Sequence, residues 1–399
     1  MGEPKEPRNV VRVEQSIDAV DPAHWDACAN PPTRPYNPFI SHDFLKAMED
    51  SGSVSADTGW LPQHLVMESE AGAVLGCMPC YLKSHSQGEY VFDYGWATAF
   101  ESAGGDYYPK LQCSVPFTPA TGRRLLVRDD DDRAENETLL AYAAVQLTKR
   151  LEASSLHMTF LTEGEWEHLG ELGLLRRTDQ QFHWLNRDYG SFDDYLSALA
   201  SRKRKAIKRE RRAACSNDVT IELITGDDIG EEHWDAFFAF YMDTGSRKWG
   251  SPYLNRAFFT LVTETMRDRI LLIMCKRDGH YVAGALNFIG GDTLYGRYWG
   301  CIEDHPFLHF EVCYYQAIEF AIGHGLKWVE AGAQGEHKLS RGYLPVTTYS
   351  AHFIASRGLS QAVEDYLERE REAVALESRI LHEHSPFKQT RDLDLGDET

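Results

Sequence analysis

The middle of the chain carries a dense group of basic residues that could bind phosphate groups. Eight cationic side chains fall within eleven residues, and Glu210 is the one acid among them. They are Arg202, Lys203, Arg204, Lys205, Lys208, Arg209, Arg211 and Arg212. On a helix these charges would cover most of the circumference, so the segment cannot lie flat in a core. Closely spaced cations repel one another unless anions neutralise them. This favours a phosphate ligand over a solvated linker helix paired with the acidic surface.

The predicted ligand of this segment is a phosphate-bearing molecule. The acceptor stem of a tRNA, the pyrophosphate of a nucleotide-sugar and the phosphates of coenzyme A would all suit it. The residues predicted to hold them are Arg202, Lys203, Arg204, Lys205, Lys208 and Arg209.

A second group of candidates lies in one short stretch near the C-terminal end. Its members are Gln334, Glu336, His337, Lys338 and Arg341. Glu336 or His337 could remove a proton from an attacking ammonium group. Lys338 and Arg341 could stabilise an oxyanion or hold a phosphate, while Gln334 could contact the substrate. The alternative is a surface loop whose charges are solvated and whose glycines shape turns.

A third group lies in a stretch that is rich in Gly, Pro, Tyr and Asp. Tyr107, Tyr108, Lys110 and Arg123 could hold an acidic acceptor, such as a sugar phosphate or a peptide carboxylate. Aromatic residues in loops also serve as packing residues, and this interpretation is equally compatible with the pattern.

The elements that would position these residues occur twice in the same order. His24-Trp25-Asp26-Ala27 recurs as His233-Trp234-Asp235-Ala236, and each is followed by a helix entered through proline. Two hairpins follow, at 64–83 and 270–289, with turns at Ala71-Gly72 and Asp278-Gly279. The later elements are expected as aromatic strands at 90–96 and 294–300, helices near 137–152 and 310–323, short strands at 156–161 and 327–331, and closing strands that end near 184 and 353.

The repeat predicts an α/β protein of two units with mixed sheets flanked by helices. The first unit spans 1–190 with a loop insertion near 97–136, and the second spans 216–399 with a C-terminal helical tail. A basic linker helix at 191–215 joins them. In the first unit, Leu169 and Leu172 stand where the second has Lys338 and Arg341. The chemistry is therefore expected in the second unit.

Two stretches carry a family resemblance. Glu330–Tyr343 and Ser201–Arg212 resemble the signature of FemAB-like N-acyltransferases, often described as peptidoglycan biosynthesis or recognition proteins. The resemblance covers nearly the whole chain, including 116–126 and 385–388. It implies tandem GNAT-type (acyl-CoA N-acyltransferase) domains and transfer of an acyl group to an amine. The Fem ligases of this group take amino acids from aminoacyl-tRNA.

The donor is expected to be aminoacyl-tRNA or acyl-CoA, with no tightly bound cofactor and no metal. The usual coenzyme A loop of GNAT enzymes is rich in glycine, whereas the stretch 303–310 has no glycine and two acids. This favours aminoacyl-tRNA. The acceptor would be a small-molecule or peptide amine, such as a cell-wall precursor. The alternative is a non-catalytic module that recognises peptidoglycan or RNA on a degenerate GNAT fold.

Composition predicts whether the protein binds membranes and in which compartment it lies. The formal net charge of −20 argues against a general coat for nucleic acid or anionic membranes. No apolar run approaches the roughly 18 residues of a membrane span. Eight scattered cysteines without a secretory signal are typical of a reducing compartment, so we expect a cytoplasmic protein. The sequence does not indicate an oligomeric state.

Overall fold

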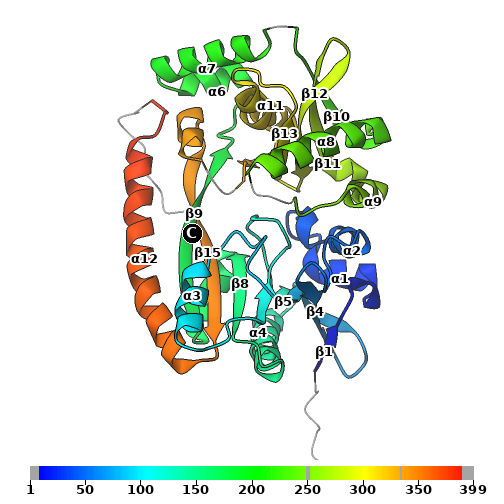
Figure 1. The fold of residues 1–399 in the computed structure, drawn as a ribbon, viewed down its shortest axis with the longest axis vertical. Helices are drawn as coiled ribbons and strands as arrows, with labels where there is room; N and C mark the ends of the chain where they lie inside the picture. The colour runs from blue at the N-terminus through cyan, green and yellow to red at the C-terminus, as the bar shows by residue number, and fades with distance from the viewer. Residues whose placement is uncertain (1–8, 217, 249–251, 333–334, 389–399) are drawn as a thin grey trace, which may run out of the picture.

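A mixed sheet of eleven strands forms the centre of the molecule (Figure 1). The computed structural model describes residues 9–216, 218–248, 252–332 and 335–388, except for the side chains of 246–248 and 336. In spatial order the large sheet consists of β10 (Thr220–Thr225), β11 (Ile270–Arg277), β12 (His280–Ile289), β13 (Thr293–Cys301), β14 (Trp328–Glu330), β9 (Leu175–Leu185), β15 (Leu344–Ile354), β8 (Ser155–Leu161), β6 (Lys110–Cys113), β5 (Cys80–Lys83) and β2 (Trp60–Pro62). A smaller sheet consists of β1 (Val10–Glu14), β3 (His64–Glu68), β4 (Val74–Met78) and β7 (Leu126–Val127).

The two halves exchange their last strands. β9, from the first half, pairs with β14 of the second half, and β15, from the second half, pairs with β8 of the first. β9 and β15 also pair antiparallel with each other at the centre. The sheet therefore runs without a break past the boundary predicted near residue 190. On both sides of this centre an antiparallel pair (β9–β14 and β15–β8) is followed by a parallel pair (β14–β13 and β8–β6) and by an antiparallel pair (β13–β12 and β6–β5). Duplication of one unit stays a prediction.

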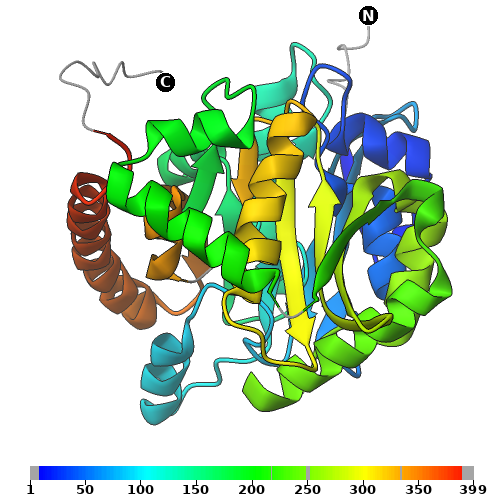
Figure 2. The same ribbon diagram turned by 90° about the horizontal axis from the view of Figure 1, so that it is seen from above.

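Helices cover both faces of the sheet. They are α1 (Pro22–Ala29), α2 (His42–Asp50), α3 (Tyr94–Ser102), α4 (Arg133–Arg150), α5 (Glu163–Glu171), α6 (Phe192–Ala198), α7 (Ser201–Ala214), α8 (Glu231–Lys248), α9 (Arg256–Met266), α10 (Leu308–Phe310), α11 (Gln316–Gly323) and α12 (Arg357–Glu383). A π-helical turn, Glu311–Tyr315, joins α10 to α11. Figure 2 shows α6 and α7 on the same face as α11, and the three share one apolar core. In the described ranges, no helix combines the length and the apolar character that crossing a membrane requires.

The halves are also joined through a shared aromatic core. Phe44 of α2 packs edge-on against Phe258 of α9, with ring centroids 5.8 Å apart, and against Phe288 of β12 at 5.5 Å. At Gly291 the backbone amide donates to the Tyr36 carbonyl at 2.8 Å. A Cβ atom there would lie 2.5 Å from the Tyr36 nitrogen, so this approach requires glycine. The halves thus form one body.

Several predicted elements are confirmed. The mixed α/β class is as expected, and α4, the 308–323 helix, β8 and β14 lie where the repeat places them. The hairpin between β11 and β12 turns at Asp278 and Gly279, whose φ angles of 51° and 78° suit a two-residue turn of the I′ type.

The aromatic strand expected at 90–96 is wrong. The chain forms a loop there and enters α3 at Tyr94. Lys110 draws Glu89 and Asp93 of this loop into the interior, and Trp96 packs in a small core against α12. The strand that does pair between β5 and β8 is β6, which lies inside the segment 97–136 that was expected to be a loop insertion.

The basic segment forms two helices rather than one. α6 ends before Leu199 and Ala200, and the Ala200 amide donates to the Pro386 carbonyl at 2.9 Å instead of continuing a helix. α7 then packs on the body through Ile207, which is buried, and through Arg211. Arg211 forms ion pairs with Glu311 at 2.9 Å and Glu319 at 2.7 Å. Of the other cations of α7, Lys208 forms an ion pair with Asp193 at 3.2 Å.

Candidate functional site

The predicted loop forms a 3-10 turn, Glu336–Arg341, between β14 and β15. Gly342, with a φ of 81°, ends this turn, and a Cβ atom there would come within 2.9 Å of the Tyr195 hydroxyl. That hydroxyl donates to the Arg341 carbonyl at 2.7 Å and fixes the turn against α6. Gln334 and the side chain of Glu336 lie outside the described residues.

Lys338 is the most deeply buried cation of the loop, with 1% of its surface exposed. Its ammonium donates to the Gly332 carbonyl at 2.8 Å. Burial lowers the pKa of Lys338 to about 8. A buried amine with such a pKa is typical of a functional site.

Arg341 and His337 form an aromatic cluster beside Lys338. The Arg341 guanidinium lies 3.6 Å from the ring centroid of Phe310 and donates to Glu210 at 3.0 Å. Its Nε is buried and has no hydrogen-bond partner among the described residues. The Nε2 atom of His337 lies 2.8 Å from the Tyr314 hydroxyl, and burial, with Arg341 and Lys338, lowers the pKa of the imidazole. His337 is therefore neutral at neutral pH.

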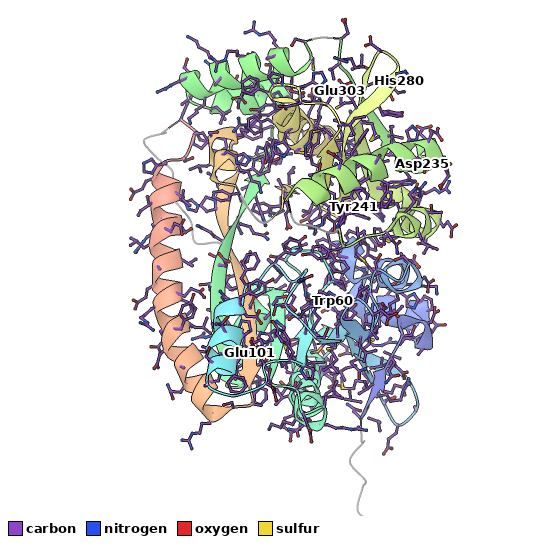
Figure 3. The ribbon with its side chains drawn as sticks, in the orientation of Figure 1. Trp60, Glu101, Asp235, Tyr241, His280 and Glu303 are labelled. Atoms are coloured by element: carbon purple, nitrogen blue, oxygen red, sulfur yellow. The ribbon has the colours of Figure 1, made fainter. Side chains whose placement is uncertain are left out.

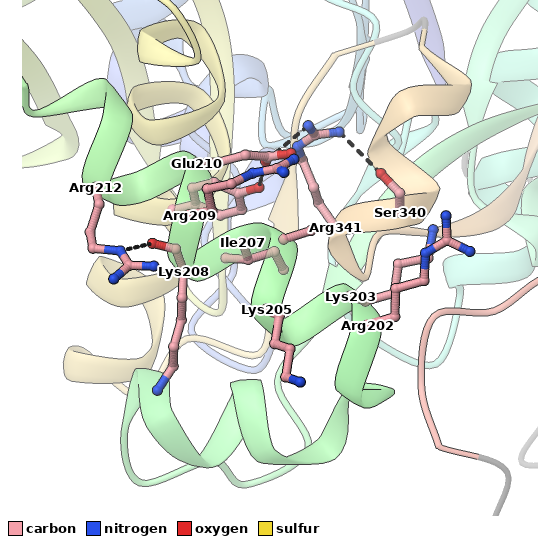
Figure 4. Close-up of a pocket in the computed structure, with 12 residues that line it drawn as sticks. Arg202, Lys203, Lys205, Ile207, Lys208, Arg209, Glu210, Arg212, Ser340 and Arg341 are labelled. Atoms are coloured by element: carbon pink, nitrogen blue, oxygen red, sulfur yellow. Dashed lines mark hydrogen bonds and ion pairs between the residues drawn. The ribbon is translucent and has the colours of Figure 1, made fainter.

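The structure brings the basic helix and the loop to one pocket of about 910 Å³, hereafter the basic pocket (Figure 4). Five of the six predicted phosphate-binding residues line it, namely Arg202, Lys203, Lys205, Lys208 and Arg209. Arg212, Ser340 and Arg341 line it as well. Arg204 does not. Lys208 pairs with Asp193 at 3.2 Å, whereas no described carboxylate pairs with Arg202, Lys203, Lys205 or Arg209.

A smaller cavity of about 140 Å³ lies where β13 and β14 diverge. The two strands run parallel only from Thr293–Tyr295 beside Trp328–Glu330. Beyond them, His309, Tyr314, Arg297 and Ala331 contribute to the lining. Tyr314 contacts His337 on one side, and Lys338 binds the carbonyl of the residue after Ala331. We call this space the splay cavity.

The corresponding gap in the first half is filled. β6 and β8 run parallel only as far as Cys113 and Met158. The next residue on β8, Thr159, accepts a hydrogen bond from Arg124 at 3.1 Å. Arg124 is fully buried and also donates to carbonyls of its own loop, such as Ala120 at 2.9 Å. In the first half, the Arg124 side chain thus lies where β6 and β8 stop pairing.

The third predicted group lies in the first half, separate from the loop. Tyr107 donates to Asp93 at 2.8 Å, Tyr108 bonds with Ser86 at 2.8 Å, and Lys110 is completely buried. Arg123 donates to the carbonyls of Cys28 and Ala29, both at 2.7 Å. Lys110 and Arg123 thus have structural partners, and their contact with an acceptor stays a prediction.

Glu330 is a candidate that the sequence reasoning missed. It is the last residue of β14, and 13% of its side chain is exposed. Its nearest basic partner is His183, whose Nδ1 lies 3.9 Å away, beyond hydrogen-bond range. Burial raises the pKa of Glu330 to about 8, against the effect of Arg297 and Arg124 and with that of Asp292. Burial, with Lys338, lowers the pKa of His183 to about 3, so this imidazole is neutral. One signal was available, because a carboxylate at the end of the short strand opens the motif Glu330–Tyr343.

We expect Glu330→Gln to stabilise the protein at alkaline pH. The pKa of Glu330 is about 8 in the folded state and about 4.5 when exposed, so the native state binds more protons between these values. Its contribution to stability therefore falls as the pH rises through this window. Since one pKa unit corresponds to about 1.4 kcal/mol, the free energy of unfolding of the variant should exceed that of the wild type by about 2–4 kcal/mol at about pH 9. At about pH 5 the two should nearly coincide.

Urea denaturation at both pH values measures this difference. Glu101→Gln removes an exposed carboxylate (labelled in Figure 3) and should change stability at neither pH. Equal stability of the Glu330 variant and the wild type at about pH 9 would show that Glu330 ionises there without cost.

Residues 16–389 match the model of the FemAB-like family, described as peptidoglycan biosynthesis/recognition. No curated protein matches the sequence. The crystal structure of FemX is similar with a TM-score of 0.55 and 14% identity, over 86% of this chain and 98% of that one. The C-terminal domain of a protein named as a lysylphosphatidylglycerol synthetase of Agrobacterium fabrum has a TM-score of 0.53 and 10% identity, over 88% and 96%. A Bacteroides thetaiotaomicron protein of unknown function has a TM-score of 0.50 and 13% identity, over 86% and 100%.

At these identities the structural neighbours establish the fold, and the family match establishes the kinship. The predicted mixed α/β fold is confirmed, and it is similar to that of FemX. By its match over almost the whole length, the chain belongs to the FemAB-like family.

Proposed function

We propose that this protein transfers an acyl or aminoacyl group from an activated donor, aminoacyl-tRNA or acyl-CoA, to an amine acceptor. One observation carries the proposal. The unpaired cations of α7 and the loop residue Arg341 line the same basic pocket, although they are far apart in the chain. Lys338, three residues before Arg341, lies beside the splay cavity. A phosphate-binding surface thus adjoins a buried ammonium, and a phosphate-bearing ester or thioester would need both.

The acidic turn before α10 favours aminoacyl-tRNA as the donor. In a GNAT enzyme this turn would bind the pyrophosphate of coenzyme A, as the resemblance implies. Here Glu303 (labelled in Figure 3) pairs with Arg277 at 3.2 Å and with His305 at 2.9 Å. A carboxylate at this position disfavours a diphosphate, whereas the basic pocket offers several cations to a polyanion.

The proposed reaction forms an amide. The nitrogen of the acceptor attacks the carbonyl carbon of the donor, the C–N bond forms, and the C–O or C–S bond breaks. The nitrogen loses a proton, and the leaving oxygen or sulfur takes one up. Lys338 would stabilise the oxyanion, and Arg341 would hold a donor phosphate. Glu336 or His337 would assist deprotonation. The filled gap at Arg124 supports assigning the chemistry to the second half.

Removing two cations of the basic pocket tests the donor side. We expect Lys205→Gln with Arg209→Gln to weaken binding of charged tRNA about tenfold at low salt. Each phosphate contact removed should lower the slope of log K against log salt by about one. Arg204→Gln is the matched control, because Arg204 lies on the same helix outside the pocket. Filter binding of charged tRNA and of acetyl-CoA at two salt concentrations measures the effect.

The outcomes separate the candidate functions. Salt-dependent tRNA binding that is lost only in the double variant supports an aminoacyl donor. Binding of acetyl-CoA alone supports an acyl-CoA donor. If the double variant and Arg204→Gln behave alike, the pocket does not bind the donor. Retained ligand binding without a covalent product would favour the recognition module.

A further inference from the structure

One face of the central strands carries a second, apolar pocket. Strand pairing places Glu330 beside His183, and His183 beside Leu344. Since side chains alternate along a strand, Trp328, Leu185 and Val346 lie on this same face. The C-terminal end of α12 and the segment after it cover the face. They leave a cavity of about 150 Å³, hereafter the C-terminal pocket.

Apolar side chains dominate the lining of the C-terminal pocket. The walls are formed by Leu185, Trp328, Leu344, Pro345, Val346 and Phe387. Arg187 and His382 stand at its exposed rim, where the Arg187 guanidinium lies 5.0 Å from the ring centroid of Phe387. An apolar cavity of about 150 Å³ is large enough to admit benzene. The pocket thus fits one group of about the size of an aromatic ring.

Glu330 stands between the C-terminal pocket and the splay cavity. His183, its neighbour on β9, lines the former, and Ala331, the next residue in the chain, lines the latter. No described residue donates a hydrogen bond to the Glu330 carboxylate, and His183 already has Gln181 at 3.1 Å from its Nε2. Ionisation of a mostly buried carboxyl group that accepts no hydrogen bond costs free energy. A cation that pairs with the carboxylate would offset this cost.

We propose that the C-terminal pocket binds the apolar group of the acceptor and that Glu330 binds the acceptor's ammonium. The acceptor is then a primary amine joined to an apolar or aromatic group. Glu330 takes one proton from the ammonium, which leaves the neutral amine to attack the carbonyl of the donor held at the splay cavity. The reaction step rests on the proposed function, whereas the binding of the amine does not.

Binding of small arylamines tests the inference directly. The probes are benzylamine, 2-phenylethylamine and 4-phenylbutylamine, which vary the distance between ring and ammonium, and benzyl alcohol, which has no ammonium. Calorimetric titration above the pKa of Glu330 should show saturable binding of at least one amine. Glu330→Gln should weaken that amine at least tenfold and leave benzyl alcohol unchanged. Val346→Trp should abolish binding of both by filling the pocket.

Leu376→Trp is the control for Val346→Trp, because Leu376 lies on the exposed surface of α12. It should leave all titrations unchanged, and circular dichroism should show that each variant is folded. Absence of arylamine binding, or binding that neither Glu330→Gln nor Val346→Trp reduces, would overturn the inference.

The inference and the proposed function can fail separately. Arylamine binding that depends on Glu330, without transfer from any donor, would contradict the proposed function and still support the amine-binding site. If Val346→Trp does not slow transfer to amines, the result would contradict the inference and still support the proposed function.

Discussion

Replacing Lys110 with methionine is expected to lower the free energy of unfolding by about 3–5 kcal/mol. Lys110 is completely buried, and its ammonium binds Glu89 at 2.7 Å, Ser86 at 2.7 Å and Asp93. Burial opposes its charge, but Glu89 and Asp93 outweigh that effect and raise the pKa of Lys110. Methionine fills a similar volume, leaves buried Asp93 without its cation and leaves Glu89 with Lys83 alone, at 3.8 Å.

The same cluster predicts which carboxylate partner of Lys110 contributes most to stability. Burial raises the pKa of Glu89 to about 7 and lowers that of Lys83 to about 7, so these two groups lose most of their charge readily. Although burial also disfavours the charge of Asp93, Lys110 and His157 lower the pKa of this carboxyl. Asp93–Lys110 is therefore the permanent ion pair, and adding Asp93→Asn to Lys110→Met should recover much of the lost stability.

Urea denaturation of the single and double variants measures both effects. Lys149→Met serves as the control, because Lys149 is exposed on α4 and has no ion pair among the described residues. It should change the free energy of unfolding by less than about 1 kcal/mol. If Lys110→Met has no larger effect than this control, the cluster does not hold the loop before α3.

Lys110 illustrates the limit of local sequence reasoning. A lysine among tyrosines and glycines is typical of an exposed binding loop, and only the pairing of β6 between β5 and β8 places it inside. The order of the repeat located most helices and strands because periodicity and turns are local signals. The exchange of β9 and β15 was not predictable, since either closing strand satisfies its own sequence pattern in both arrangements.

The candidate site shows the same contrast. The types of residues at 202–209 and at Lys338 and Arg341 indicated phosphate and oxyanion chemistry without a structure. That the two segments face one pocket depends on α7 crossing the turn before α11, which no local pattern specifies. The sequence did not indicate Glu330 as a candidate, because a single glutamate on a short strand is ordinarily solvated. Its function as a candidate depends on His183 of the other half lying beside it.

Replacing Lys338 is expected to have a large effect on the rate of transfer. We expect Lys338→Ala to reduce transfer at least 10²–10³-fold, which is about the loss seen when one oxyanion donor is removed. The fold should persist, because the ammonium makes one hydrogen bond, to the Gly332 carbonyl, and leaves no buried carboxylate unpaired among the described residues. Single-turnover transfer from charged tRNA or acetyl-CoA to an arylamine measures the rate. Lys149→Met should leave it unchanged.

The dependence of the rate on pH distinguishes a chemical role for Lys338 from a packing role. With a pKa of about 8, Lys338 loses its charge as the pH rises, so a cationic role predicts that the rate falls above about pH 8. Lys338→Arg keeps the charge at all these pH values and should remove this alkaline decline even if the rate is lower. A decline that persists in Lys338→Arg, or undiminished turnover in Lys338→Ala, would remove Lys338 from the mechanism. The oxyanion would then have to be stabilised by another hydrogen-bond donor.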